Sequence, residues 1–127
     1  MTIKNKGYTL TYVILAMVLS AALASSLYTT VFLHNRLFTQ LQYNKLAFYK
    51  ACSGTEYALY IIRSGHYADP TNTGSWPPVP AGATVQITTS GAVPPLYTII
   101  STGTDSGVQK TITVTEQSGE TISWQVS

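Results

Sequence analysis

The chain has 127 residues, a formal net charge of +2 and only 9% charged residues, whereas about a quarter of the residues in a soluble globular domain are charged. This length allows one small domain once an anchor is subtracted. No basic patch with interleaved aromatic residues provides the electrostatic footprint of a strong nucleic-acid-binding protein, so nucleic acid is not an expected partner. The single cysteine, Cys52, excludes an intramolecular disulfide.

The first 33 residues separate into a short basic segment and a long uncharged one. Residues 1–7 (MTIKNKG) contain Lys4 and Lys6, and residues 8–33 (YTLTYVILAMVLSAALASSLYTTVFL) carry no charge, proline or glycine. About 20 apolar residues cross a bilayer core as a helix, so residues 8–33 are predicted to be the transmembrane half of a helix. The two lysines predict that the N-terminal end stays in the cytoplasm and that the rest faces outward.

Residues 34–64 are predicted to continue this helix as an amphipathic half. They contain no proline, and their apolar residues recur at steps of three, four and seven. The predicted core-facing stripe is Leu37, Leu41, Phe48, Cys52, Thr55, Leu59 and Ile62. The predicted opposite side holds Asn35, Thr39, Gln42, Lys50, Ser53, Tyr57 and Tyr60. Glycine suits a helix C-cap, so Ser64-Gly65 is the first predicted stop, and a helix over 8–64 would be about 85 Å long.

Residues 65–127 are expected to form a loop and a β-sheet head. Residues 65–83 are rich in Gly, Pro, Asn, Ser and Thr, which indicates a loop. Four alternating, β-branched runs follow, with turn residues between them, at residues 84–88, 97–101, 110–115 and 121–126. A lone sheet this small needs a partner. We therefore predict an α+β fold in which an antiparallel meander covers the helix stripe with residues such as Ile112, Val114, Ile122, Trp124 and Val126.

The N-terminal region resembles the type IV pilins and pseudopilins, whose precursors begin with a short basic leader that ends in glycine. The matching residues are Lys4 to Gly7, followed by Tyr8-Thr9-Leu10-Thr11-Tyr12 before the apolar run. A second stretch, residues 47–60, is similar to the end of the long helix in certain minor pilins, with the pattern Gly-x-Glu-Tyr-Ala at residues 54–58. The resemblance covers residues 1–64; the β region matches only in type.

The resemblance implies a pilin-like fold and a defined maturation. Residues 1–7 would be the leader, a prepilin peptidase would cut after Gly7, and the new N-terminal amine of Tyr8 would be methylated. The chain would then be a structural subunit anchored in the cytoplasmic membrane and later part of an extracellular or periplasmic pilus or pseudopilus. Its implied partners are other pilin subunits, the prepilin peptidase, the membrane and the inner-membrane assembly machinery.

Tyr12 departs from the family pattern, which has a glutamate at this position, five residues after the cut. In the family that carboxylate offsets the buried amine of a neighbouring subunit. A tyrosine carries no negative charge at neutral pH, so this subunit cannot offset the amine in the same way. The secretion pseudopilin at the filament tip also lacks the glutamate. We therefore hypothesise a minor subunit at the tip or initiating end of the filament.

Two other interpretations of the N-terminus stay open. In a secretory signal peptide, Ala22-Leu23-Ala24 would be the cleavage site and the mature chain would start at Ser25. Against this, the uncharged run continues to Leu33 and the helical pattern to residue 64. In the other interpretation, the chain is a signal-anchored, small β-rich surface or binding protein that does not polymerise.

No enzyme, metal or cofactor site is predicted. His34 and His66 are separated by a predicted helix of about 45 Å and cannot share a site, and Asp69 near His66 is expected to be solvated. Cys52 is expected to be a buried, inert thiol. Glu56 has Lys50 and Arg63 as candidate ion-pair partners. The aromatic and proline residues of the loop, His66, Tyr67, Trp76 and Pro77-Pro78, are of a kind found at contact surfaces or folded back on a sheet.

Overall fold

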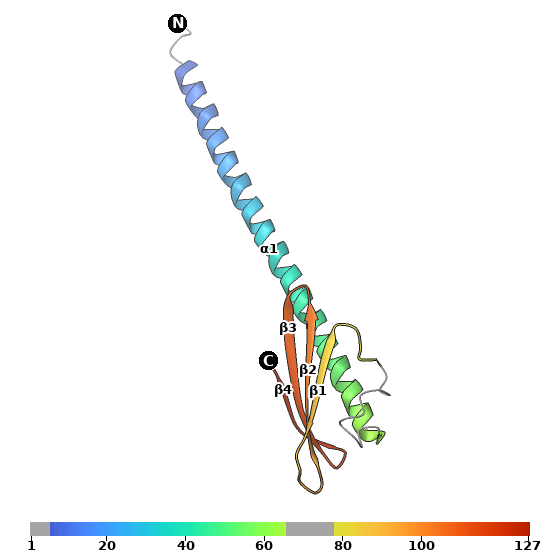
Figure 1. The fold of residues 1–127 in the computed structure, drawn as a ribbon. Coiled ribbons are helices and arrows are strands. Elements are labelled where there is room, and N and C mark those ends of the chain that lie inside the picture. Colours follow the sequence, from blue (N-terminus) through green and yellow to red (C-terminus); the bar gives the residue numbers. More distant parts are fainter. Residues whose placement is uncertain (1–5, 66–77) are drawn as a thin grey trace. The chain divides into compact units, whose positions relative to one another are not determined.

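The computed structural model describes residues 6–65 and 78–127. Most of the predicted leader and the loop positions His66, Tyr67, Asp69, Trp76 and Pro77 lie outside the described residues. Within the described ranges the elements are α1 (Lys6–Arg63), β1 (Ala83–Thr89), β2 (Leu96–Asp105), β3 (Val108–Gln117) and β4 (Glu120–Val126) (Figure 1). One long helix with a four-stranded sheet is the α+β layout that the sequence predicts.

Two compact units make up the chain. The first is Met1–Gln40 and contains the uncharged part of α1. The second, Leu41–Ser127, contains the end of α1 and the whole sheet. We call the second unit the head.

The end of α1 follows the predicted stop signal. Gly65 has a positive φ of 73°, a conformation that glycine adopts without the steric cost of a Cβ. Its N–H donates to the carbonyl oxygen of Ile62 at 3.2 Å, and the N–H of Ser64 donates to that of Tyr60 at 2.9 Å. These bonds satisfy carbonyl groups that a helix end otherwise leaves unpaired.

The sheet is an antiparallel meander in the order β1-β2-β3-β4. The turn between β2 and β3 has positive φ at both Ser106 and Gly107, and the turn between β3 and β4 has it at Ser118 and Gly119. Two-residue turns of this kind match the twist of the strands they connect. All four predicted strands are therefore present, each longer than its alternating run in the sequence.

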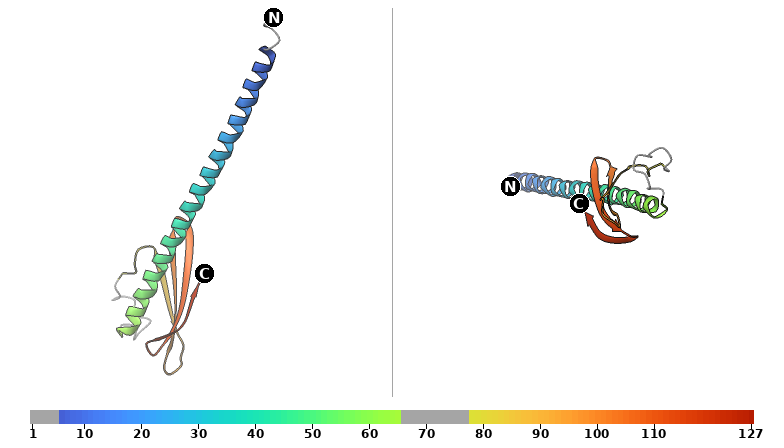
Figure 2. Two further views of the ribbon diagram at one scale, coloured as in Figure 1. Left: turned by 180° about the vertical axis from the view of Figure 1, so that it is seen from behind. Right: turned by 60° about the horizontal axis from the view of Figure 1, so that its bottom comes forward.

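In the head, α1 lies across one face of the sheet, as the front and back views show (Figure 1, Figure 2). The fully buried core joins small helix residues to β-branched residues of the two central strands: Ala51, Ala58, Ile99, Ile112 and Val114. A Cβ on Gly103 of β2 would collide with the carbonyl oxygen of Ala47 and the backbone nitrogen of Ala51. The helix backbone therefore rests directly on β2.

Part of the predicted packing is wrong. The fully buried helix residues in the head include Ala47, Ala51, Ala58 and Ile61, whereas Phe48, Cys52 and Leu59 of the predicted stripe are only half-buried and Leu41 is 60% exposed. Among the predicted stripe residues in the head, Thr55 alone is fully buried. Close approach of the helix backbone to β2 requires small side chains between them, so the contact centres on the alanines and moves the bulky residues to one side.

The predicted helix-facing side of the sheet is buried on β3 as expected, but the expected burial is wrong for β4. Ile112 and Val114 are fully buried, but Ile122, Trp124 and Val126 are about half exposed. Trp124 pairs with Val114 and Val126 with Ile112, so their side chains leave the sheet on the helix side. The helix lies over the central strands β2 and β3, and it leaves the side chains of Trp124 and Val126 on β4 uncovered.

Candidate functional site

The first unit presents a long uncharged surface. Every residue from Gly7 to Gln40 is exposed, and no Asp, Glu, Lys or Arg occurs between Lys6 and Arg36. By its length and composition, α1 can cross a membrane. An all-round apolar surface of this kind is typical of a helix that is buried in lipid or protein.

Hydroxyl groups along this stretch bind to the helix's own backbone. Four of them donate to the carbonyl oxygen four residues earlier, at 2.8–2.9 Å: Thr11, Ser20, Thr29 and Thr30. Because hydrocarbon offers no water to accept these hydrogen bonds, internal pairing lowers the cost of placing the hydroxyls in a dry environment. The stretch is chemically suited to a bilayer core or a protein core.

The predicted processing junction, Gly7-Tyr8, lies in the first turns of α1. A Cβ on Gly7 would meet nothing within 4 Å, and Gly7 has no positive φ. Glycine inside a helix is unfavourable relative to alanine by about 0.5–1 kcal/mol. The described fold therefore gives no reason for glycine at position 7, in contrast to Gly103, and a requirement for it would come from a partner such as a peptidase.

Tyr12 lies on α1 one turn after Tyr8, and both side chains are about 70% exposed (69% and 72%). Like its neighbours in the first unit, Tyr12 offers an uncharged surface. Gly7, Tyr8 and Tyr12 thus lie together on the first two turns of α1.

Two ion pairs fix the end of α1 to the sheet. Lys50 pairs with Asp105 at the end of β2, and its Nζ also donates to the carbonyl oxygen of Thr104 at 3.1 Å. Arg63 Nε donates to Glu116 Oε1 of β3 at 3.0 Å. The structure thus gives Lys50 and Arg63 partners other than Glu56, because the sheet brings two carboxylates to the helix that are more than 50 positions away in sequence.

Glu116 is a polar residue on an otherwise apolar strand face. It follows Ile112 and Val114 on the helix side of β3 and is fully buried, and its Oε2 accepts no hydrogen bond from the described residues. The sequence contained this signal, since a glutamate two residues after Val114 shares its face. An alternating apolar pattern does not identify Glu116 as a core residue, because such a pattern selects apolar residues only.

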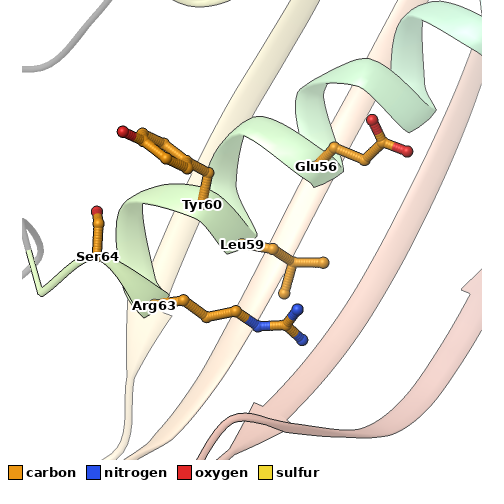
Figure 3. A pocket seen from close by; sticks show the side chains of 5 residues that line it. All are labelled: Glu56, Leu59, Tyr60, Arg63 and Ser64. Atoms are coloured by element: carbon orange, nitrogen blue, oxygen red, sulfur yellow. The ribbon is translucent and has the colours of Figure 1, made fainter.

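An open pocket of about 470 Å³ near the end of α1 is lined by Glu56, Leu59, Tyr60, Arg63 and Ser64. Figure 3 shows that Glu56, Leu59 and Arg63 extend to one side of the helix, whereas Tyr60 and Ser64 extend away from them. The depression is a gap between helix side chains, and it contains no set of groups arranged for catalysis.

Within the part of the chain that the structure describes, candidate catalytic and metal-binding residues are not brought together. Among residues 6–65 and 78–127, no group of three or more His, Cys, Asp or Glu could hold a metal ion. His34 is exposed on α1, and His66 and Asp69 lie outside the described residues. Burial, and secondly the charge of Glu56, raise the pKa of the Cys52 thiol above its usual value, which disfavours the nucleophilic thiolate.

Comparisons of the chain with models of protein families, with curated proteins and with solved structures find no match.

Proposed function

We propose that this chain is a membrane-anchored structural subunit of a filament of the type IV pilus or type II secretion pseudopilus kind. The observation that carries the proposal is the exposed, uncharged stretch from Gly7 to Leu33, on the same helix whose last turns support the sheet. A surface of that size without charge is unsuited to water. It is suited to two dry environments in turn, the bilayer before assembly and the filament core after it.

In this scheme the chain inserts with its N-terminus in the cytoplasm, a prepilin peptidase cuts after Gly7, and the amine of Tyr8 is methylated. The free space around Gly7 supports a role for this glycine in recognition by the peptidase. The helical junction has to unwind locally before cleavage, and glycine lowers the cost of that step.

Tyr12 supports a minor subunit at the initiating or tip end, because a tyrosine cannot offset the amine of a preceding neighbour by charge. The test is the composition of purified filaments. A small share of this chain, located at filament ends by antibody labelling, is expected; its recovery as the main repeating component would contradict this position.

Intact-mass measurement of the native protein tests the proposal directly. The expected mass corresponds to a chain that starts at Tyr8 and carries one additional methyl group. A start at Ser25 would indicate a cleaved signal peptide, and an uncut chain from Met1 would indicate a plain anchored protein. Either result would refute the proposed maturation.

Two glycine-to-lysine variants, one at the proposed cut site and one elsewhere in the chain, test the role of Gly7. Gly7→Lys is expected to leave the leader attached and to keep the protein in the membrane without filament incorporation. Gly91→Lys adds the same charge at another glycine with no atoms within 4 Å of its Cβ position, and it should be processed normally. Normal incorporation of Gly7→Lys would count against the scheme.

A further inference from the structure

A second pocket lies at the end of the head where α1 stops. The β1–β2 connection and the β3–β4 turn meet the last turn of α1 there, at the lower end of the sheet in Figure 1. Its volume is about 340 Å³, in the lower part of the range for small-ligand sites. We call it the end pocket; its lining includes Ile62, Arg63, Pro94, Pro95, Tyr97 and Glu116.

Hydrogen bonds hold the apolar wall of the end pocket in place. At the base of the β1–β2 connection, the N–H of Ser90 donates to the carbonyl oxygen of Leu96 at 2.9 Å, and the N–H of Leu96 donates to Ser90 Oγ at 3.2 Å. Gln117 Nε2 at the end of β3 donates to the carbonyl oxygen of Pro94 at 3.1 Å. Because each proline ring also fixes its own φ, Pro94 and Pro95 form a wall that exists before any ligand binds.

Glu116 is the buried polar member of the lining. Its side chain is fully buried, and the β3–β4 register shifts between Thr115 and Glu116, an irregularity of the kind that re-aims a side chain. Oε1 accepts a hydrogen bond from Arg63 Nε, whereas Oε2 accepts none from the described residues. A buried acceptor without a donor is unfavourable, so a donor from outside these residues would stabilise Oε2.

Arg63 supplies the complementary groups, because a guanidinium carries five N–H donors and no acceptor. Its Nε donates to Glu116, and one terminal nitrogen reaches the carbonyl oxygen of Gly119 at 3.5 Å. The side chain is 51% exposed, so its remaining donors are accessible to a ligand. The end pocket thus combines an unpaired acceptor and accessible donors in one ion pair that is neutral as a whole.

We propose that the end pocket binds an amide group, whose N–H donates to Glu116 Oε2 and whose carbonyl oxygen accepts from the Arg63 guanidinium. An amide combines a donor and an acceptor without charge. A carboxylate would be repelled by Glu116, and an ammonium would be repelled by Arg63 and would leave a net charge in the pocket. The aliphatic part of the ligand would contact Pro94, Pro95 and Tyr97.

Two sources supply this chemistry: the carboxamide of an Asn or Gln side chain, and the peptide bond of an extended segment. Both offer one N–H and one carbonyl oxygen to the same pair of protein groups. The site lies within the head, and the inference therefore does not depend on leader removal or on filament assembly.

Nuclear magnetic resonance titration of the isotope-labelled full-length chain in detergent micelles tests the ligand class. The probes are propionamide, propionate and propylammonium, which have the same number of carbon atoms and differ in charge. Propionamide is expected to shift the Arg63 Nε–H and Gly119 N–H signals saturably, with a Kd on the order of millimolar or weaker for so small a ligand. The two ions are expected to bind at least about fivefold more weakly.

N-methylacetamide, a model of the peptide bond, is the fourth probe. Tighter binding of propionamide would support a side-chain carboxamide as the source, and tighter binding of N-methylacetamide would support a peptide backbone. Absence of saturable shifts with both amides would overturn the proposal. Binding of propionate or propylammonium as tightly as the better amide would overturn it as well, because the pocket would then select a charge.

Glu116→Gln and Glu120→Gln form a matched pair of variants. Both convert a carboxylate into a carboxamide, but Glu120 is exposed and lies outside the end pocket. Glu116→Gln is expected to weaken propionamide binding by about tenfold or more, because the accepting oxygen is lost. Glu120→Gln should leave the Kd within a factor of about two. Unchanged binding by Glu116→Gln with a wild-type near-ultraviolet circular dichroism spectrum would refute the role of Oε2.

The comparison of probes uses the wild-type chain, so it decides the ligand class even where Glu116→Gln fails to fold. The proposed function is tested separately by the mass of the native protein. A chain that starts at Tyr8 but binds no amide would leave the proposed function intact and the end pocket wrong; amide binding by a chain that keeps its leader would have the opposite meaning.

Discussion

Replacement of Gly103 by alanine is expected to destabilise the head strongly. The added methyl group would collide with the carbonyl oxygen of Ala47 and the backbone nitrogen of Ala51. Overpacking of a core costs about 1–3 kcal/mol. Because the obstacles here are backbone atoms of a helix held by two ion pairs, and not flexible side-chain ends, we expect the upper end, about 3 kcal/mol.

A loss of about 3 kcal/mol lowers the Tm of a unit the size of the head by about 12–24 °C, at about 4–8 °C per kcal/mol. The assay is thermal unfolding of the full-length protein in detergent micelles, followed by near-ultraviolet circular dichroism. This signal reports the packing of aromatic residues such as Trp124. It separates melting of the head from the helical signal of the detergent-embedded segment.

Gly91→Ala is the matched control. A Cβ at Gly91 meets nothing within 4 Å, and this glycine has no positive φ. The same substitution there should change stability by less than about 1 kcal/mol, in the stabilising direction, because alanine restricts the unfolded chain. If Gly103→Ala lowered the Tm no more than Gly91→Ala, the direct contact between the α1 backbone and β2 would be refuted.

Three further predictions concern the ion pair, the anchor and the cysteine. Arg63→Met should lower the free energy of unfolding by about 1–3 kcal/mol, because it leaves the buried Glu116 without its partner; Glu116→Gln should lower it less, and equal urea midpoint shifts would contradict this. Leu19→Lys should reduce carbonate-resistant membrane association, since insertion of a central lysine costs about 2.5–3.5 kcal/mol, whereas Leu46→Lys should not. Alkylation of Cys52 should show a higher thiol pKa in the folded protein than in the urea-unfolded chain, because burial and secondly the charge of Glu56 disfavour the thiolate; an equal or lower pKa in the folded protein would contradict that environment.

Much of the secondary structure could be predicted because its signals are local. The uncharged run and the following period of three and four residues predicted one long helix, and Gly65 predicted its end. β-branched alternation predicted the four strands, and turn residues between the runs predicted the connections, two of which the structure forms at Ser106-Gly107 and Ser118-Gly119. The predicted junction Gly7-Tyr8 and Tyr12 depend on partners outside the chain, so their roles stay predictions.

The sequence by itself determined which segments are helix and strand and where an uncharged helix half begins and ends, because these properties depend on neighbours a few residues apart. Only the tertiary structure decided which helix face meets the sheet. Apolar periodicity measures hydrophobicity, whereas the contact with Gly103 requires small residues, so Ala47 and Ala51 are fully buried and Phe48 and Leu59 are only half-buried. The ion-pair partners also depend on distances across the sheet, which no local pattern contains.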